Sequence, residues 1–341
     1  MTKDSYPLEQ SEYKDIRNIP VEDIFKSLVD NRSNIFYPWT SISSVSELQL
    51  LYILLDNKIK CNILQYEGID NKIDILDQCS SQEEKDSAMC DNNIWLKENA
   101  EKIAKKYTNC AKNKEPLYIP MTVKTIKGWH ANSILLNPYR NEAEHFEPHG
   151  SKYRGSGILG TVDWKEGIKD INKYLDKKLQ LKYIIPKEVC PRQKYFNRFR
   201  GYQSADRGGN DGKPKLFEGV VVTEIGGYCE MWNLFQLDLR LKTLRRSSGE
   251  VFNDMIKLFD EEGGKGEGQM IELMRGLSKY SWQQLINSLK PKFNKNNVTR
   301  EELIAYLDDS KDLDKEVSSR VWGNLYDMKH EILKNKFGKV F

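Results

Sequence analysis

The stretch CEMWNLFQLDLRL, from Cys229 to Leu241, is apolar on nearly every side when it is drawn as a helix. Such a helix is buried on all of its faces, because it leaves no polar face for water. The rest of the chain must therefore supply elements that surround it. Of the 341 residues, 39% are hydrophobic and 30% are charged. This normal soluble balance is enough to build a core of useful size.

The residue pattern changes twice along the chain and predicts three regions. Residues 1–110 are polar and mostly helical, with helices expected over 44–59 and 93–110. Residues 111–245 mix strands and helices, and residues 246–341 are helical again. Strands are predicted over 116–126, 129–137, 142–148, 181–186 and 219–223, and an amphipathic helix over 163–179.

Charge and cysteine usage exclude several classes of protein. The net charge of +3 gives no global argument for nucleic acid. The six cysteines form no CxxC pair and the four histidines lack finger-like spacing, so we expect no metal site. The start of the chain is polar and acidic, and no apolar run reaches about 18 residues. We therefore expect a soluble protein, neither secreted nor bound to a membrane, with mostly free thiols.

His130 and Glu147 lie near the two ends of a predicted hairpin. The midpoint between them falls at Pro138–Tyr139, inside a turn signal rich in Asn and Pro. Residues opposed across such a hairpin lie about 4.5–5.5 Å apart at Cβ, and a carboxylate beside an imidazole fixes its tautomer. A turn displaced by one residue would instead set Pro148 or Phe146 opposite His130. The alternative role for His130 is that of an ordinary structural or surface histidine.

Cys229 follows Gly226, Gly227 and Tyr228 and begins the apolar helix. Free N–H groups and a partial positive charge at a helix N-terminus favour a thiolate, which is the nucleophilic form of cysteine. The alternative role for Cys229 is that of a small, buried hydrophobic residue. The backbone N–H of Cys229 is one candidate donor to an oxyanion. For the second donor, a side-chain amide, we favour Gln203 over Gln193, although both could be surface residues.

Together these segments resemble the adenovirus-protease and ubiquitin-like-protein-protease superfamily of cysteine peptidases. In adenovirus-type enzymes a histidine precedes a glutamate by seventeen positions, in a Phe-Glu-Pro-x-Gly segment that residues 146–150 match. Members from giant DNA viruses are similar in Cys-Pro before a Gln-containing loop, here Cys190-Pro191 and Gln203, and in Gly-Tyr-Cys-x-x-Trp at the nucleophile, here 227–232. The resemblance covers roughly residues 115–242. The sequence departs from it where Trp129 precedes His130, and where VVVTEI stands in place of the usual glutamine.

The resemblance implies an α+β, papain-like fold in which a small twisted mixed sheet packs on a central helix that carries the nucleophile. It divides the chain into a helical region (1–110), a catalytic core (111–245) and a helical extension (246–341). Cys229 would attack a carbonyl, His130 would transfer the proton, and Glu147 would hold the imidazole. The residues that line the cleft would include Trp129, Asn132, Gly227, Tyr228 and Trp232, although Trp232 also suits the core. No metal or organic cofactor is implied.

The substrates implied are proteins cut after glycine-rich sequences, either viral precursors or ubiquitin-like conjugates, in the host cytoplasm or the virion. The basic and aromatic stretch 187–207 is compatible with contacts to nucleic acid, but such stretches are more often solvated surface. Two other functions stay open. One is an acetyltransferase that uses the same triad, and the other is a virion or scaffold protein that has lost catalysis.

Overall fold

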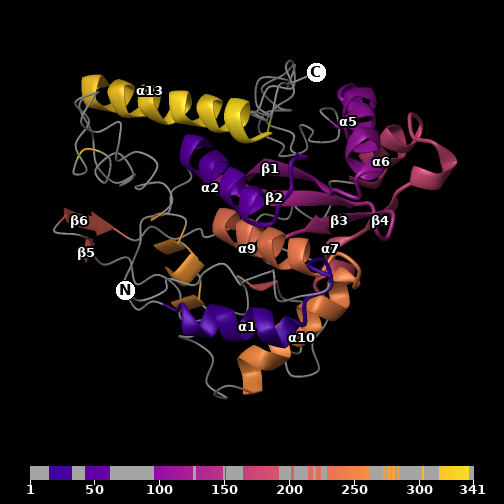
Figure 1. The fold of residues 1–341 in the computed structure, drawn as a ribbon, viewed down its shortest axis with the longest axis horizontal. Helices are drawn as coiled ribbons and strands as arrows, with labels where there is room; N and C mark the ends of the chain where they lie inside the picture. Colours follow the sequence, from indigo (N-terminus) through magenta and orange to yellow (C-terminus); the bar gives the residue numbers. More distant parts are fainter. Residues whose placement is uncertain are drawn as a thin grey trace.

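The computed structural model describes residues 15–32, 43–61, 96–125, 128–148, 150, 164–191, 201–202, 214–217, 220–223, 229–261, 272–273, 275–277, 279–280, 283, 302 and 315–337. It is an α+β protein in which helices surround a small sheet (Figure 1). The helices are α1 (Val21–Asp30), α2 (Ser43–Asp56), α5 (Ala100–Lys112), α6 (Trp164–Asn172), α7 (Pro186–Val189), α9 (Cys229–Lys242), α10 (Ser248–Glu261) and α13 (Lys315–Ile332). In this part of the chain, no helix is long and apolar enough to cross a membrane.

The main sheet has four strands in the order β1 (Leu117–Thr125), β2 (Gly128–Asn137), β3 (Glu142–Phe146) and β4 (Lys182–Ile184). The first three strands are antiparallel, and β4 pairs in parallel with β3, which makes the sheet mixed. These four strands confirm the sequence predictions. A separate hairpin joins β5 (Pro214–Phe217) to β6 (Val220–Thr223), and of these two only β6 was predicted.

The turn between β2 and β3 sets the register of the whole site. Asn137 pairs with Glu142, so four residues form the loop and its centre lies between Tyr139 and Arg140. The Asn137 side chain accepts the N–H of Tyr139 at 3.0 Å, and Asn141 adopts a positive φ of 52°. Both features favour asparagine. The predicted midpoint at Pro138–Tyr139 is therefore wrong by one residue, because it overlooked the left-handed position at Asn141.

Helix α9 is buried along its length, as its sequence predicts, with every residue except Glu230 shielded from water. It packs against β2 and α2 (Figure 1). The charged residues in its C-terminal half form ion pairs: Arg240 binds Glu144 of β3, and Lys242 binds Asp238. Asp238 also accepts the Asn57 side-chain amide at 2.9 Å. Paired in this way, charged groups are tolerated in the interior.

One hydrophobic cluster draws members from all three regions that the sequence suggests, including Leu51, Leu135 and Phe252. Both faces of the sheet are covered. On β3, Glu144 is directed to α9, while His145 packs against Trp164 at the start of α6. The sheet therefore lies inside the core, and its central strands are in a position to hold a shielded site.

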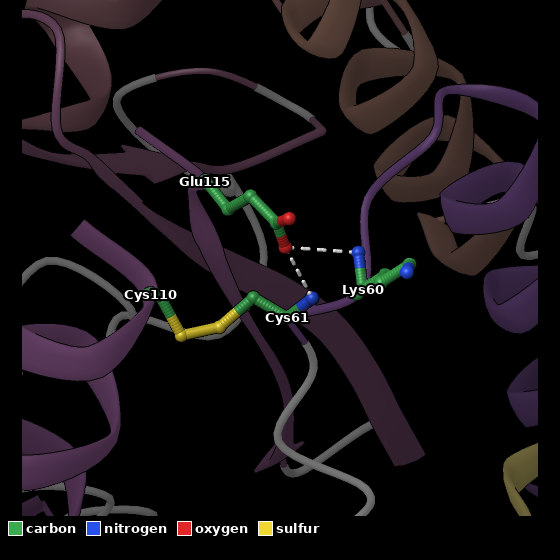
Figure 2. Close-up of a disulfide and its surroundings, with 4 residues drawn as sticks. All are labelled: Lys60, Cys61, Cys110 and Glu115. Atoms are coloured by element: carbon green, nitrogen blue, oxygen red, sulfur yellow. Dashed lines mark hydrogen bonds between the residues drawn. A yellow bond between two sulfur atoms is a disulfide. The ribbon is translucent and has the colours of Figure 1, made fainter. Parts of the chain in front are cut away.

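A disulfide joins Cys61, just beyond α2, to Cys110 in α5, with the two Cα atoms 5.7 Å apart (Figure 2). Beside it, the carboxylate of Glu115 accepts the backbone N–H groups of Lys60 at 2.9 Å and Cys61 at 2.7 Å. This pair is an exception to the mostly free thiols expected, and it joins two segments 49 residues apart in sequence. Cys190 and Cys229 are buried and take part in no disulfide.

Candidate active site

Cys229 lies directly beside the strand that carries His130. The backbone N–H of Ala131 donates a hydrogen bond to the Sγ of Cys229 at 3.3 Å, across 98 residues of sequence. Only a Cα–C bond and a C–N bond, about 1.5 and 1.3 Å, separate the Cα of His130 from that nitrogen. The sulfur therefore lies within about 6.2 Å of the His130 Cα. The two segments that the sequence analysis singled out do meet in space.

The contact arises where β2 runs past the end of β3. The last described pair between these strands is Ser133 with Phe146, so Ala131 lies beyond the paired part of β3. There its C=O accepts the side-chain N–H of Asn233 at 3.0 Å, while its N–H binds Cys229. The first turn of α9 thus supplies hydrogen-bond partners for the backbone of β2 where β3 has ended. Because both backbone groups of Ala131 are used, the position of Cys229 relative to β2 is fixed.

Cys229 is the first residue of α9, as predicted, and 8% of its surface is exposed. Cys190, the other free thiol in the described chain, has no exposed surface. Burial raises the pKa of the Cys190 thiol, and the nearby Glu147 carboxylate raises it further. Cys190 is therefore shielded and held as a thiol. Of these two cysteines, Cys229 is the one with some exposed surface.

His130 and Glu147 are not directly opposed, so this prediction is wrong. One step beyond the Ser133–Phe146 pair, the register sets Asn132 opposite Glu147. Position 130 then lies diagonally from position 147, about 7–8 Å away between Cα atoms in a regular ladder. The four-residue loop explains the difference. It moves the centre of the turn by one residue, so the residue on β3 that faces a given position on β2 changes by two. Glu147 itself is 5% exposed.

The segment after β3 forms a tight turn. Gly150 donates its N–H to the C=O of Glu147 at 2.8 Å, and Gly150 has a positive φ of 82°. Proline in the second position of this turn and glycine in the fourth suit its geometry. Gly201 packs against it so closely that an added Cβ would lie 2.1 Å from the C=O oxygen of Pro148. Only glycine fits there without moving the turn.

Tyr202 connects this turn to the nucleophile helix. Its ring lies 6.0 Å from that of Phe146, the last residue of β3, and stacks on Trp232 at 5.6 Å, one turn beyond Cys229. Burial raises the pKa of the Tyr202 phenol, with a further contribution from Cys190. The Phe-Glu-Pro-His-Gly turn, the Gly-Tyr pair at 201–202 and the start of α9 therefore form one packed unit.

The remaining predicted site residues fall into three groups. Trp129 pairs with Lys124 in the β1–β2 ladder. Asn132 is 3% exposed and Trp232 is fully buried, so both belong to the interior rather than to an open cleft. Burial of Trp232 agrees with the alternative role in the core. Gln203, Gln193, Gly227 and Tyr228 lie outside the described residues.

His145 is the residue that sequence reasoning missed. Its Nε2 lies 3.1 Å from Asn132 Oδ1, and its Nδ1 lies 2.8 Å from the hydroxyl of Tyr183 on β4. Burial lowers the pKa of His145 to about 4, although the Glu147 carboxylate acts in the opposite direction. The ring is therefore neutral at pH 7. A histidine inside an otherwise buried strand was the available signal, because such a group requires partners.

Among the described residues, no group of three or more His, Cys, Asp or Glu side chains could hold a metal ion. Beside Cys229, the side-chain N–H of Asn233 donates to the C=O groups of Ala131 and Cys229. What the arrangement offers is a cysteine at a helix N-terminus, with its sulfur held against a strand that carries a histidine. Those parts suit nucleophilic rather than metal-assisted chemistry.

No family model matches the chain, and no solved structure matches it. Over 145 residues the chain is 19% identical to a protein of Acanthamoeba polyphaga mimivirus that is named as an ankyrin repeat protein. The matched stretch makes up 41% of this chain and spans 17% of the length of that protein. This distant similarity assigns no activity to the chain.

Proposed function

We propose that the protein is a cysteine peptidase or isopeptidase in which Cys229 is the nucleophile and His130 the general base. The hydrogen bond from Ala131 to the Cys229 Sγ carries this proposal, because it places the sulfur beside the residue that follows His130. Nucleophile and base from distant parts of a chain must meet in this way for thiol catalysis. A central helix that begins with the cysteine, packed on a small mixed sheet, supports a papain-like core.

The other described histidines are less suited to act as the base. Both ring nitrogens of His145 have partners, and its low pKa keeps it neutral. His330 lies on α13 with its ring against Tyr326, and α13 packs on α2. His149 lies outside the described residues. His130 is therefore the histidine that the described contacts favour.

The proposed reaction proceeds in two steps. His130 takes the thiol proton of Cys229, the sulfur attacks the carbonyl carbon, the C–N bond breaks, and His130 gives that proton to the leaving amine. His130 then takes a proton from water, which attacks the thioester and releases the carboxylic acid and the thiol. The backbone N–H of Cys229 donates to the oxyanion. Glu147, diagonal to His130, orients the base.

The substrate class proposed is a protein with a glycine-rich sequence at the cleaved bond, either a viral precursor or a ubiquitin-like conjugate. Support for it is the sequence resemblance of residues 115–242. Only 8% of the surface of Cys229 is exposed, so the approach to it is narrow. Glycine residues suit a narrow approach, because they have no side chain.

The test is a Gly-Gly peptide vinyl sulfone, with the labelled residue identified by peptide mapping. We expect the wild-type protein to be labelled at Cys229, Cys229→Ala to lose labelling, and His130→Gln to slow it. Cys190→Ala is the matched control, because it removes a fully buried thiol. Labelling of Cys229 by iodoacetamide no faster than the other free thiols would favour the scaffold alternative. Acetylation of Cys229 by acetyl-CoA without reaction with the peptide probe would favour an acetyltransferase.

A further inference from the structure

A chain of polar groups, which starts at the partly buried Tyr183, runs from β4 to the strand that carries His130. The hydroxyl of Tyr183 lies 2.8 Å from His145 Nδ1, and His145 Nε2 lies 3.1 Å from Asn132 Oδ1. Asn132 directly follows Ala131, the donor to the Cys229 sulfur. The chain therefore ends next to the candidate active site, although none of its bonds reaches the sulfur.

Chemistry fixes the direction of these hydrogen bonds. An amide oxygen only accepts, so His145 Nε2 carries the proton and donates it to Asn132. The neutral ring then leaves Nδ1 as an acceptor for the Tyr183 hydroxyl, and the pKa of about 4 keeps the ring in that state. The edge-on contact of His145 with Trp164, at 5.2 Å between ring centres, holds the imidazole in place. The Asn132 carboxamide is thus held with its oxygen facing His145.

The other end of this carboxamide is unsatisfied. The Nδ2 of Asn132 is shielded from water and has no hydrogen-bond partner. A buried donor without a partner is costly and calls for an explanation. A candidate acceptor is Glu147, which falls opposite Asn132 when the register is continued one step past the Ser133–Phe146 pair, and whose carboxylate raises the pKa of His145.

We propose that Tyr183 and His145 are positioning residues, which hold Asn132 so that its Nδ2 donates to the Glu147 carboxylate when substrate binds. Catalytic hydrogen bonds are often long in the free enzyme and close only in the complex. In this arrangement Asn132 fixes the carboxylate, and the carboxylate orients the imidazole of His130. The inference rests on the proposed peptidase function and adds three residues to its site.

The test compares substitutions that keep or remove each donor, using the peptide vinyl sulfone probe. Tyr183→Phe removes the hydroxyl alone, and Tyr174→Phe, at a tyrosine that is 55% exposed, is its matched control. His145→Gln keeps an N–H that can donate to Asn132, whereas His145→Leu keeps only the bulk. For Tyr183→Phe and His145→Leu we expect about a 10-fold lower maximal labelling rate, from the loss of one hydrogen bond. The probe concentration that gives half of the maximal labelling rate should not change.

Rescue by the polar variant separates positioning from packing. We expect His145→Gln to keep most of the wild-type rate although it buries a polar group, and His145→Leu to lose it. Equal rates for the two variants, or equal rates for Tyr183→Phe and Tyr174→Phe, would overturn the inference and leave the peptidase proposal standing. If wild-type Cys229 does not react with the probe at all, the proposed function fails and the inference fails with it.

Discussion

Arg240 and Glu144 form a bidentate ion pair inside the protein. The Nε of Arg240 donates to Glu144 Oε2 at 2.7 Å and its Nη2 donates to Oε1 at 2.9 Å, with side chains 1% and 3% exposed. Asn137 donates to the same carboxylate at 2.9 Å. This pair fixes the C-terminal half of α9 to β3. Since α9 is one rigid helix, it also helps to set where Cys229 meets β2.

Removal of one partner of this pair should be strongly destabilising. Glu144→Gln leaves the Arg240 guanidinium buried without a counter-charge, and we expect the free energy of unfolding to fall by about 3–5 kcal/mol. Urea denaturation followed by circular dichroism measures the change. The double variant Glu144→Leu/Arg240→Met should recover a large part of the loss, because it removes both charges. A single variant as stable as wild type would contradict a buried pair.

Two glycines should respond to alanine in opposite directions. Gly201→Ala puts a Cβ against the backbone of Pro148 and Gly150, and we expect a loss of about 1–3 kcal/mol in unfolding free energy. Gly323 in α13 has nothing within 4 Å of an added Cβ, so Gly323→Ala should stabilise the protein by about 0.5–1 kcal/mol. Thermal unfolding of both variants measures whether stability falls in the first and rises in the second.

Stability should fall as the pH falls through the range of His145. The pKa of His145 is about 4 in the folded protein against 6.5 for the free side chain. Between these values the unfolded chain binds a proton that the folded protein does not, so the free energy of unfolding decreases as the pH falls below 6.5. The contribution reaches about 3 kcal/mol near pH 4. It is measured as the difference between wild type and His145→Gln in how far the unfolding free energy changes from pH 7.5 to pH 4.5.

Asp56 acts in the opposite direction over part of this range. Burial raises its pKa to about 6 from 3.8, so the folded protein binds a proton first and gains stability as the pH falls through 6. His145→Gln separates the two effects, because it leaves Asp56 unchanged. The variant should lose less stability between pH 7.5 and pH 4.5 than wild type. An equal loss in both proteins would show that His145 is not buried as described.

Reduction of the Cys61–Cys110 disulfide should weaken the protein. The bond closes a separation of 49 residues, and the loop-entropy model gives about 4 kcal/mol for a loop of that size. Melting with and without a phosphine reductant measures the loss. The Cys61→Ala/Cys110→Ala variant is the matched control, because its melting temperature should not respond to reductant. A wild-type protein that is equally insensitive would argue against the bond.

Much of the fold followed from local patterns. The apolar helix that begins at Cys229 and the strands of the hairpin could be predicted, because burial and strand pairing leave a strong periodic signal. The position of the turn could not, since it depends on a positive φ at Asn141 and on the side chain of Asn137. The error was one residue at the turn and changed which residue faces Glu147.

The site was predictable only in its parts. The proximity of Cys229 to His130 was expected from the resemblance, whereas the bond to Ala131 depends on β3 being short enough to expose the edge of β2. His145 was missed because its partners, Asn132 and Tyr183, lie on two other strands. Contacts of this kind depend on strand order. The local sequence does not predict that β4 pairs in parallel with β3.

The disulfide also decides what happens when the backbone is broken. A protease that cuts once between residues 61 and 110 would leave two fragments tethered through sulfur, which would separate only after reduction. The piece with α1 and α2 would stay packed against α9, α10 and α13. The N-terminal helices are therefore retained without an intact main chain, and a nicked molecule can keep the architecture of an uncut one.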